Sequence, residues 1–121
     1  MSVFNAIPKS DWLFETEDFF AIYDKYPTSK GHLLIISKES VLDYYALTVS
    51  QKQDLIIALE LGRELLQNNF APDGYNIGMN CGEAAGQTVF HFHCHIIPRY
   101  KGDVPDPRGG VRHSVIGKGY Y

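Results

Sequence analysis

The fold is decided by the stretch Val-Phe-His-Phe-His-Cys-His-Ile-Ile-Pro, residues 89–98. Side chains alternate between the two faces of a β-strand, so His91, His93 and His95 lie in one row, about 6.5–7 Å apart. The apolar residues between them point to the opposite face and supply the buried side that a strand needs to join a core. Imidazole acts as a nucleophile, a proton carrier or a phosphate partner near neutral pH, so this row indicates a chemical site.

Two other interpretations of the row are open. A single histidine on a strand is most often a structural residue, and three neutral histidines can also hold a catalytic zinc ion. Against zinc, Cys94 leaves the opposite face of the strand, and Cys81 has no Cys-x-x-Cys partner. We therefore expect no metal ion bound by the protein itself.

Length and composition describe one ordinary globular domain. The 121 residues suffice to bury a core, with an apolar share of 45% and a charged share of 21%. A formal net charge of -3 argues against binding nucleic acid, which usually needs a basic face. The pattern predicts neither a secretory signal nor a membrane span, and two cysteines make no disulfide framework, so we expect a cytoplasmic protein.

Local patterns outside the histidine row predict an α+β domain. A capping box begins at Thr48 and predicts a helix that runs to about Asn69. Pro98 is expected to end the histidine strand, because proline cannot donate a backbone hydrogen bond. Strands around one long helix indicate an antiparallel sheet. Three further strands are predicted, over residues 18–24, 31–37 and 74–80.

The turn Gly86-Gln87-Thr88 comes directly before the histidine row. Glycine lets a ligand approach the backbone, and the Gln87 amide and the Thr88 hydroxyl are donors suited to phosphate oxygens. Such a turn alone is most often only a hairpin. Followed by three alternating histidines, it favours a phosphate site.

The sequence resembles the histidine triad (HIT) family of nucleotide-binding hydrolases and transferases. Its motif, His-x-His-x-His followed by two apolar residues, is matched by residues 91–97, and the similarity covers roughly residues 12–103. The resemblance implies a HIT-like fold: an antiparallel sheet of about five strands with one long helix and a short one, continued across a homodimer. We divide the chain into a HIT domain, residues 1–105, and a C-terminal tail containing glycine and arginine, residues 106–121.

Residue by residue, the resemblance implies that His93 attacks an α-phosphorus and forms a nucleotidyl-histidine intermediate. His95 would contact the phosphate and assist the leaving group, while His91 and His32 would orient the others. For Asp24, a solvated loop carboxylate is the alternative to a ribose contact. The expected substrate-binding residues are Ile22 and Leu34 on the base, Asp24 on the ribose, and Asn80, Gly86, Gln87 and Thr88 on the phosphates and the leaving group.

The resemblance divides between two branches of the family. Residues 98–103, Pro-Arg-Tyr-Lys-Gly-Asp, are similar to the Fhit-like branch, which cleaves dinucleoside polyphosphates such as diadenosine tetraphosphate. The Trp-Pro-Pro-Gly ending of Hint-like phosphoramidases is missing, although Asp24 is closer to that branch. A nucleotide-sensing scaffold with incidental turnover is the third hypothesis.

The Fhit-like interpretation has consequences for ligands and for the tail. The covalent step needs no protein-bound cofactor, so magnesium is expected only on a polyphosphate substrate, whose base we expect to be a purine. Arg99, Lys101, Arg108 and Arg112 would supply cationic groups that favour a polyphosphate. The tail would either reach over the phosphates or form a mobile terminus.

Overall fold

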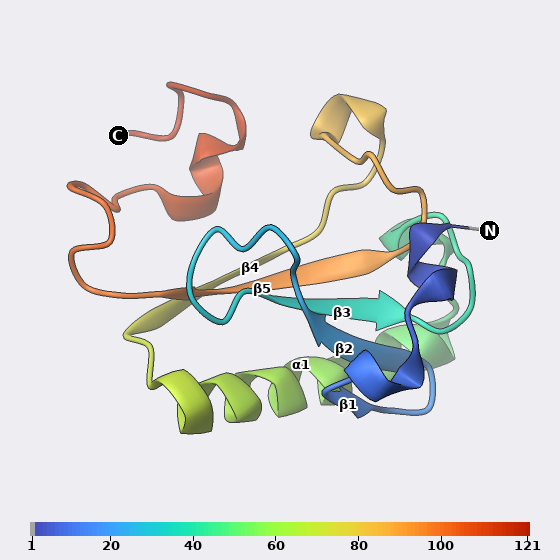
Figure 1. Ribbon diagram of the computed structural model, residues 1–121. Helices are drawn as coiled ribbons and strands as arrows, with labels where there is room; N and C mark the ends of the chain where they lie inside the picture. Colours follow the sequence, from blue (N-terminus) through green and yellow to red (C-terminus); the bar gives the residue numbers. More distant parts are fainter. Residues whose placement is uncertain (1) are drawn as a thin grey trace.

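The computed structural model describes residues 2–121. Within them, five antiparallel strands form one sheet in the order β1-β2-β3-β5-β4, and α1 (Val49–Phe70) crosses one face of it (Figure 1). The predicted α+β architecture is therefore confirmed. The strands are β1 (Phe14–Glu15), β2 (Phe19–Tyr23), β3 (Leu33–Ser37), β4 (Gly74–Gly78) and β5 (His93–Arg99). The shorter helices are 3-10 turns: η1 (Val3–Ala6), η2 (Lys9–Asp11), η3 (Tyr44–Ala46), η4 (Glu83–Ala85) and η5 (Gly110–Ser114).

The long helix begins at the predicted capping box. The Thr48 hydroxyl accepts a hydrogen bond from the Gln51 N–H at 3.1 Å, and the Gln51 side chain accepts one from the Thr48 N–H at 2.8 Å. These bonds satisfy two N–H groups that the first turn would otherwise leave free. The helix ends one residue beyond the predicted end, at Phe70, where Ala71 adopts a left-handed conformation with φ 46°.

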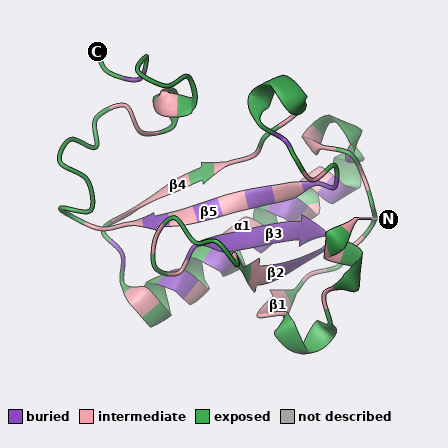
Figure 2. Cartoon of the chain, turned by 45° about the horizontal axis from the view of Figure 1, so that its top comes forward, coloured by how far each residue is buried: buried purple, intermediate pink, exposed green. Residues whose placement is uncertain are grey.

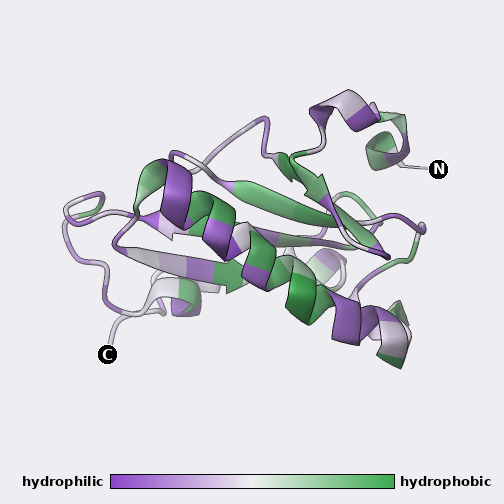
Figure 3. Ribbon diagram, turned by 90° about the horizontal axis from the view of Figure 1, so that it is seen from below, coloured by the Kyte–Doolittle hydropathy of each residue, from purple (hydrophilic) through white to green (hydrophobic). Residues whose placement is uncertain are grey.

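The helix lies close against the sheet (Figure 3). A Cβ added at Gly62 would come within 2.7 Å of Ile96 and 3.0 Å of Leu33, so a larger residue there would push the helix off the strands. Leu55, Ala58 and Leu66 on the same side of α1 are buried. No helix within residues 2–121 combines the length and the apolar composition that crossing a membrane requires.

Apolar residues pack on both faces of the sheet, in two separate clusters (Figure 2). β3 is buried along its whole length, whereas β5 alternates, with Cys94 and Ile96 fully buried toward α1 and His93 and His95 partly exposed on the other face. A second apolar cluster occupies that other face at the N-terminal side of the molecule. It joins Phe20, Leu34 and Ile36 to Phe4, Ile7, Trp12 and Ile22.

The histidine strand begins later than the row predicted. β5 starts at His93, so His91 lies in a bend before the strand and is not part of its alternation. β4 is also shorter than predicted and ends at Gly78, which leaves Asn80 in the loop that follows. The two-residue strand β1 was missed because it is too short to show a period of two.

The prediction that Pro98 ends the histidine strand is wrong, because β5 continues to Arg99. The Arg99 carbonyl oxygen accepts a hydrogen bond from the Asp73 N–H at 2.9 Å, so the backbone groups of Arg99 face β4 and those of Pro98 face the other way. The ladder between β3 and β5 has already ended at the Leu33–Ile96 pair on that side. The missing N–H of Pro98 therefore costs no ladder bond.

Candidate active site

A hollow of about 720 Å³ lies on the face of the sheet away from α1. It gathers most of the residues predicted to act on a substrate, from strands and loops that are far apart in the sequence. These are Ile22, Asp24, Leu34, Asn80, Gly86, Thr88, His93 and His95. Its other walls include Val3, Phe4 and Ile7, whose role the sequence did not indicate.

His93 is held in one tautomer by the backbone. Its Nδ1 lies 2.9 Å from the carbonyl oxygen of His91. A carbonyl oxygen can only accept, so Nδ1 carries the proton, and in the neutral ring Nε2 keeps its lone pair. His93 therefore has an unprotonated nitrogen for attack on an electrophile in the hollow.

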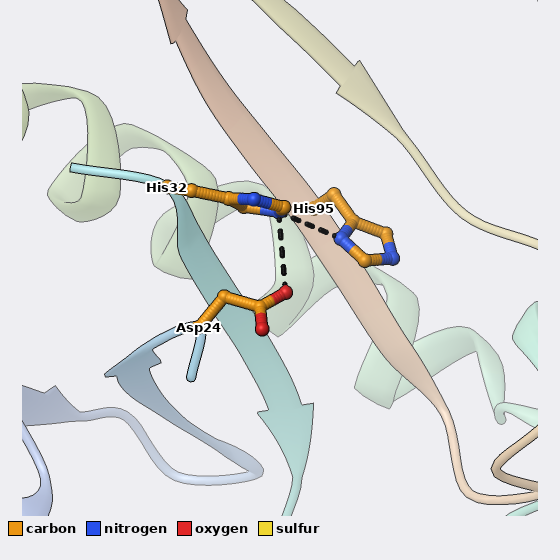
Figure 4. Close-up of side chains that lie close together, drawn as sticks. All are labelled: Asp24, His32 and His95. Carbon is orange, nitrogen blue, oxygen red and sulfur yellow. Dashed lines mark hydrogen bonds and ion pairs between the residues drawn. The ribbon is translucent and has the colours of Figure 1, made fainter. Parts of the chain in front are cut away.

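His32 and His95 form a hydrogen-bonded relay beside it (Figure 4). The Thr28 N–H donates to His32 Nδ1 at 3.1 Å, so the neutral His32 ring carries its proton on Nε2. That nitrogen lies 2.9 Å from His95 Nδ1, which must then accept. His95 consequently keeps its own proton on Nε2, as a donor for a substrate oxygen.

The electrostatics of the relay favour neutral rings. Burial, with His93 and His32 nearby, lowers the pKa of His95 to about 4 against the opposing charge of Asp24. Burial also lowers the pKa of His32, again opposed by Asp24. Both rings are therefore neutral at pH 7, as the hydrogen-bond directions require.

Asp24 closes the relay at its outer side. Its Oδ2 lies 3.5 Å from His32 Nε2, while its Oδ1 accepts a hydrogen bond from the Tyr26 N–H at 2.9 Å. The second bond fixes the turn after β2, so the carboxylate is more than a solvated loop charge. It lines the hollow where the resemblance placed a ribose contact.

The potential metal-ligand atoms of Asp24, His32 and His95 lie within 4.8 Å of one another, a spacing that a metal ion could bridge. The hydrogen bonds argue against that use. Thr28 occupies the lone pair of His32 Nδ1, so His32 Nε2 is protonated, and the lone pair of His95 Nδ1 already accepts from it. A metal ion here would have to break both bonds, so the geometry fits a hydrogen-bonded cluster better than a metal site.

His91 supports the site from behind. Its ring is buried, with Nε2 donating to the Ser37 carbonyl oxygen at 2.7 Å and Nδ1 accepting from the Ser2 hydroxyl at 2.7 Å. Burial lowers its pKa, which keeps the ring neutral. The Phe4 ring meets His91 and His93 edge-on, with centroid distances of 5.4 and 5.0 Å. His91 thus lies beside His93 with both of its ring nitrogens in hydrogen bonds, an arrangement compatible with the supporting role that the resemblance implied.

The N-terminal contribution was missed because its contacts are long-range. Ser2 and Asn5 do form a reciprocal capping box at the start of η1. The Ser2 hydroxyl accepts a hydrogen bond from the Phe4 N–H at 3.2 Å, and the Asn5 side chain accepts one from the Ser2 N–H at 2.9 Å. That local signal predicts a helical turn. It does not indicate that the turn packs against the histidines.

The predicted phosphate contact of the Gln87 side chain is contradicted by its surroundings. This side chain is buried, accepts a hydrogen bond from the Gly82 N–H at 2.8 Å and donates to the Leu42 carbonyl oxygen at 2.7 Å. Its amide is therefore used to brace the loop that carries Gly86 and Thr88. Those two neighbours line the hollow themselves.

Two of the four cations expected near a polyphosphate, Arg99 and Arg108, are paired with carboxylates. Arg99 donates to Asp103 through Nε at 2.8 Å and through Nη2 at 2.9 Å, and to Asn76 through Nη1 at 2.7 Å. Arg108 pairs with Asp106 at 3.4 Å. These carboxylates offset the charge of Arg99 and Arg108, two of the four cations on which the polyphosphate argument depended.

Comparisons with known proteins agree on one family. A family model described as HIT domain matches residues 7–102. Protein hit of Bacillus subtilis is 39% identical over 92 residues, covering 75% of this chain and 63% of that protein. Bis(5'-adenosyl)-triphosphatase of Dictyostelium discoideum is 36% identical over 97 residues, covering 80% of this chain and 65% of that one.

A solved structure agrees with them. The hypothetical histidine triad nucleotide-binding protein of Sulfolobus tokodaii superposes with a TM-score of 0.73 at 38% identity, covering 79% of this chain and 64% of that chain. The present chain thus spans somewhat less than two thirds of the length of each of these three proteins.

Proposed function

The chain belongs to the HIT domain family, and from that premise we propose that it hydrolyses dinucleoside polyphosphates at the α-phosphate through a nucleotidyl-histidine intermediate. The observation that carries the proposal is the fixed tautomer of His93, whose Nδ1–H donates to the His91 carbonyl oxygen. A similar activity is stated in the name of the Dictyostelium relative, a bis(5'-adenosyl)-triphosphatase.

In the first step, the Nε2 lone pair of His93 forms a bond to the α-phosphorus. The bond from phosphorus to the bridging oxygen breaks, and that oxygen leaves with the rest of the polyphosphate. His95 Nε2–H donates a hydrogen bond to this leaving oxygen and stabilises its charge, so that the oxygen leaves as an anion while the neutral ring keeps its proton. Dividing the displacement into two steps lowers each barrier.

In the second step, water attacks the same phosphorus. The bond between phosphorus and His93 Nε2 breaks and returns the electron pair to the ring, which releases a nucleoside monophosphate. The proton lost by the water passes to the solvent, so both histidines end in their starting protonation states. No protein-bound cofactor takes part, and magnesium would accompany the polyphosphate.

The hollow offers a place for the retained nucleoside. Ile22, Leu34, Phe4 and Ile7 present apolar walls, which suit the planar base of a purine. Asp24 provides a carboxylate for the ribose hydroxyls, in the family's manner. The Gly86 backbone and the Thr88 hydroxyl lie toward the phosphate side of the same hollow.

Phosphoramidate hydrolysis is the second candidate, and a specific observation favours it. Arg99 is engaged by Asp103 and Asn76, so the local cation that should prefer a polyphosphate leaving group is partly neutralised. A neutral amine needs no such cation. A nucleotide-sensing scaffold is a weaker alternative, because a protein that only binds has no use for a nucleophile with a fixed tautomer.

We also propose that the protein is a homodimer whose sheet continues across the interface. β4 is the end strand of the sheet, and Ile77 on it is 47% exposed. On the outer side of α1, Ile56 and Ile57 are 63% and 55% exposed. An open strand edge beside exposed apolar helix residues is a surface that a second copy would cover. Light scattering at micromolar concentration should give twice the chain mass.

Rapid acid quenching tests the chemistry. The protein is mixed for milliseconds with diadenosine tetraphosphate or an adenosine phosphoramidate, quenched and digested, and its peptides are weighed. We expect an added adenosine monophosphate on the peptide that contains His93, and none in a His93→Gln control. Turnover without any labelled histidine peptide, or a label on His95, would contradict the mechanism.

A further inference from the structure

A second hollow, of about 770 Å³, lies on the same face of the sheet as the candidate active site. Its floor continues the histidine row: Ile97 and Arg99 follow His95 at alternate positions of β5, so Ile97 is about 7 Å from His95 along that face. Asn76 of β4 pairs with Ile97 and also lines this hollow. The two hollows therefore follow one another along β5.

The space between the hollows is open at β4. Gly78 pairs with His95 across the ladder, so both residues face the same side of the sheet. Apart from Gly78 itself and its two chain neighbours, no described residue places a heavy atom within 4 Å of the position that a Gly78 Cβ would take. The phosphates of the leaving group can therefore extend from the side of His95 past this glycine toward Ile97.

The C-terminal tail builds the outer wall of the second hollow (Figure 1, red). It is a folded segment: the His113 ring donates to the Arg108 carbonyl oxygen at 2.8 Å and packs on Tyr120 with centroids 4.4 Å apart. A Cβ on Gly119 would clash with the His113 ring, and a Cβ on Gly109 would clash with the Gly119 carbonyl. In this arrangement the described tail is a folded segment that reaches the second hollow.

The lining of the second hollow suits a neutral, planar group better than an anion. Its charged groups are balanced, with Asp103 and Asp106 accompanying Arg99 and Lys30. Aromatic surfaces are available, and the Tyr120 ring is 53% exposed. The volume falls within the range of about 300–1,000 Å³ that is typical of small-molecule sites.

Hydrogen-bonding groups in the second hollow are also present. Ser29 lines the hollow, but its hydroxyl oxygen is buried and has no hydrogen-bond partner within residues 2–121, so it is not a group that a ligand in the hollow would reach. The Asn76 amide lies on the floor nearby.

We propose that the second hollow binds the nucleoside of the leaving group, so that one chain holds both ends of a dinucleoside polyphosphate. The retained nucleoside occupies the hollow at Ile22 and Leu34, the α-phosphate meets His93, and the remaining phosphates pass Gly78. The second base stacks against Tyr120. This inference rests on the proposed hydrolysis and adds a specificity site to it.

The test compares two substrates that differ only in the second nucleoside. Diadenosine tetraphosphate and adenosine 5'-tetraphosphate carry the same phosphate chain, and both release adenosine monophosphate after attack at the α-phosphorus. The wild-type protein should have a higher kcat/KM for diadenosine tetraphosphate. Tyr120→Ala should lower the ratio of the two kcat/KM values about tenfold, because stacking on one base is lost.

Two further variants show whether the effect of Tyr120→Ala comes from the second hollow. Ile97→Trp narrows the hollow from its floor by a change outside the tail, and it should lower the same ratio. Tyr121→Ala is the matched control, because Tyr121 is 76% exposed and does not line the hollow; its ratio should equal that of the wild type.

Each failure has a different pattern. An unchanged ratio in both Tyr120→Ala and Ile97→Trp, or an equal fall for both substrates, would overturn the second site while leaving the hydrolysis intact. A wild-type protein that cleaves neither substrate would overturn the proposed function and the second site together.

Discussion

The two faces of β5 are built by different means (Figure 2). Toward α1, Cys94 and Ile96 are fully buried and held by the volume of their neighbours. On the other face, His93 and His95 are held by hydrogen bonds whose direction decides which ring nitrogen carries a proton. One face therefore depends on close packing and the other on individual hydrogen bonds, so substitutions on the two faces should affect different properties of the protein.

The largest expected effect is on the histidine face. His93→Ala removes the proposed nucleophile, and turnover should fall by about 10³-fold or more. The melting temperature should fall by only about 2–6 °C, because His93 is partly exposed and the variant loses a single hydrogen bond, to the His91 carbonyl.

Kinetics and calorimetry on the same preparation check whether the loss of turnover occurs without a loss of stability. Near-normal turnover of His93→Ala would remove the residue from the mechanism. Loss of turnover together with a large fall in melting temperature would instead show that the histidine face also carries the fold.

The opposite face should respond in stability. Ile96 is fully buried against Gly62 and Leu33, so Ile96→Ala should cost about 2–5 kcal/mol of unfolding free energy. The matched variant is Ile97→Ala, which deletes the same atoms one residue further on, at a partly exposed position of the other face. Urea unfolding should show a clearly smaller loss for Ile97→Ala; equal losses would contradict the division between faces.

The face toward α1 was predictable because its signals are local. The Thr48 capping box and the alternation around Cys94 and Ile96 each lie within a few residues, and the structure confirms the elements they predicted. The family motif located His93 and His95 correctly in the hollow. What alternation could not show was the true start of β5, because the bend at His91 depends on contacts outside the strand.

The hydrogen bonds of the site were not predictable, since their partners are distant in sequence. Ser2 and His91 are 89 residues apart, and His32 and His95 are 63 apart. The side chain of Gln87 shows the reverse error: an amide that suits a phosphate by type is used within its own loop. Residue type indicates what a group can bind, and the fold decides what it does bind.

Lowering the pH acts on the histidine face through His95. The pKa of His95 is lowered to about 4 in the folded protein, against an ordinary value of 6.5, so the unfolded chain binds a proton more readily. The stability contributed by neutral His95 is fully present above pH 6.5 and is lost as pH falls toward 4. Lowering the pH from 7 to 5 should therefore reduce the melting temperature by several degrees, or roughly 3–8 °C.

A variant identifies the group responsible for this loss. His95→Asn removes the titrating ring, so its melting temperature should fall less than that of the wild type between pH 7 and 5. The buried rings of His32 and His91, whose pKa values are also lowered, should account for part of the remaining loss. An equal fall in both proteins would mean that His95 does not titrate in this way.

The smallest expected effect concerns the hydrogen bond between the Ser2 hydroxyl and the His91 ring. Ser2→Ala removes the hydroxyl that donates to His91 Nδ1 and leaves that buried nitrogen without this partner, at a cost of about 1 kcal/mol. Because the His91 carbonyl orients His93, kcat should also fall a few-fold, with KM nearly unchanged. Ser2→Thr keeps the hydroxyl and should restore kcat, whereas a purely structural role would lower stability in Ser2→Ala with no change in kcat. The hydroxyl at residue 2 would then stabilise the bend without orienting the nucleophile.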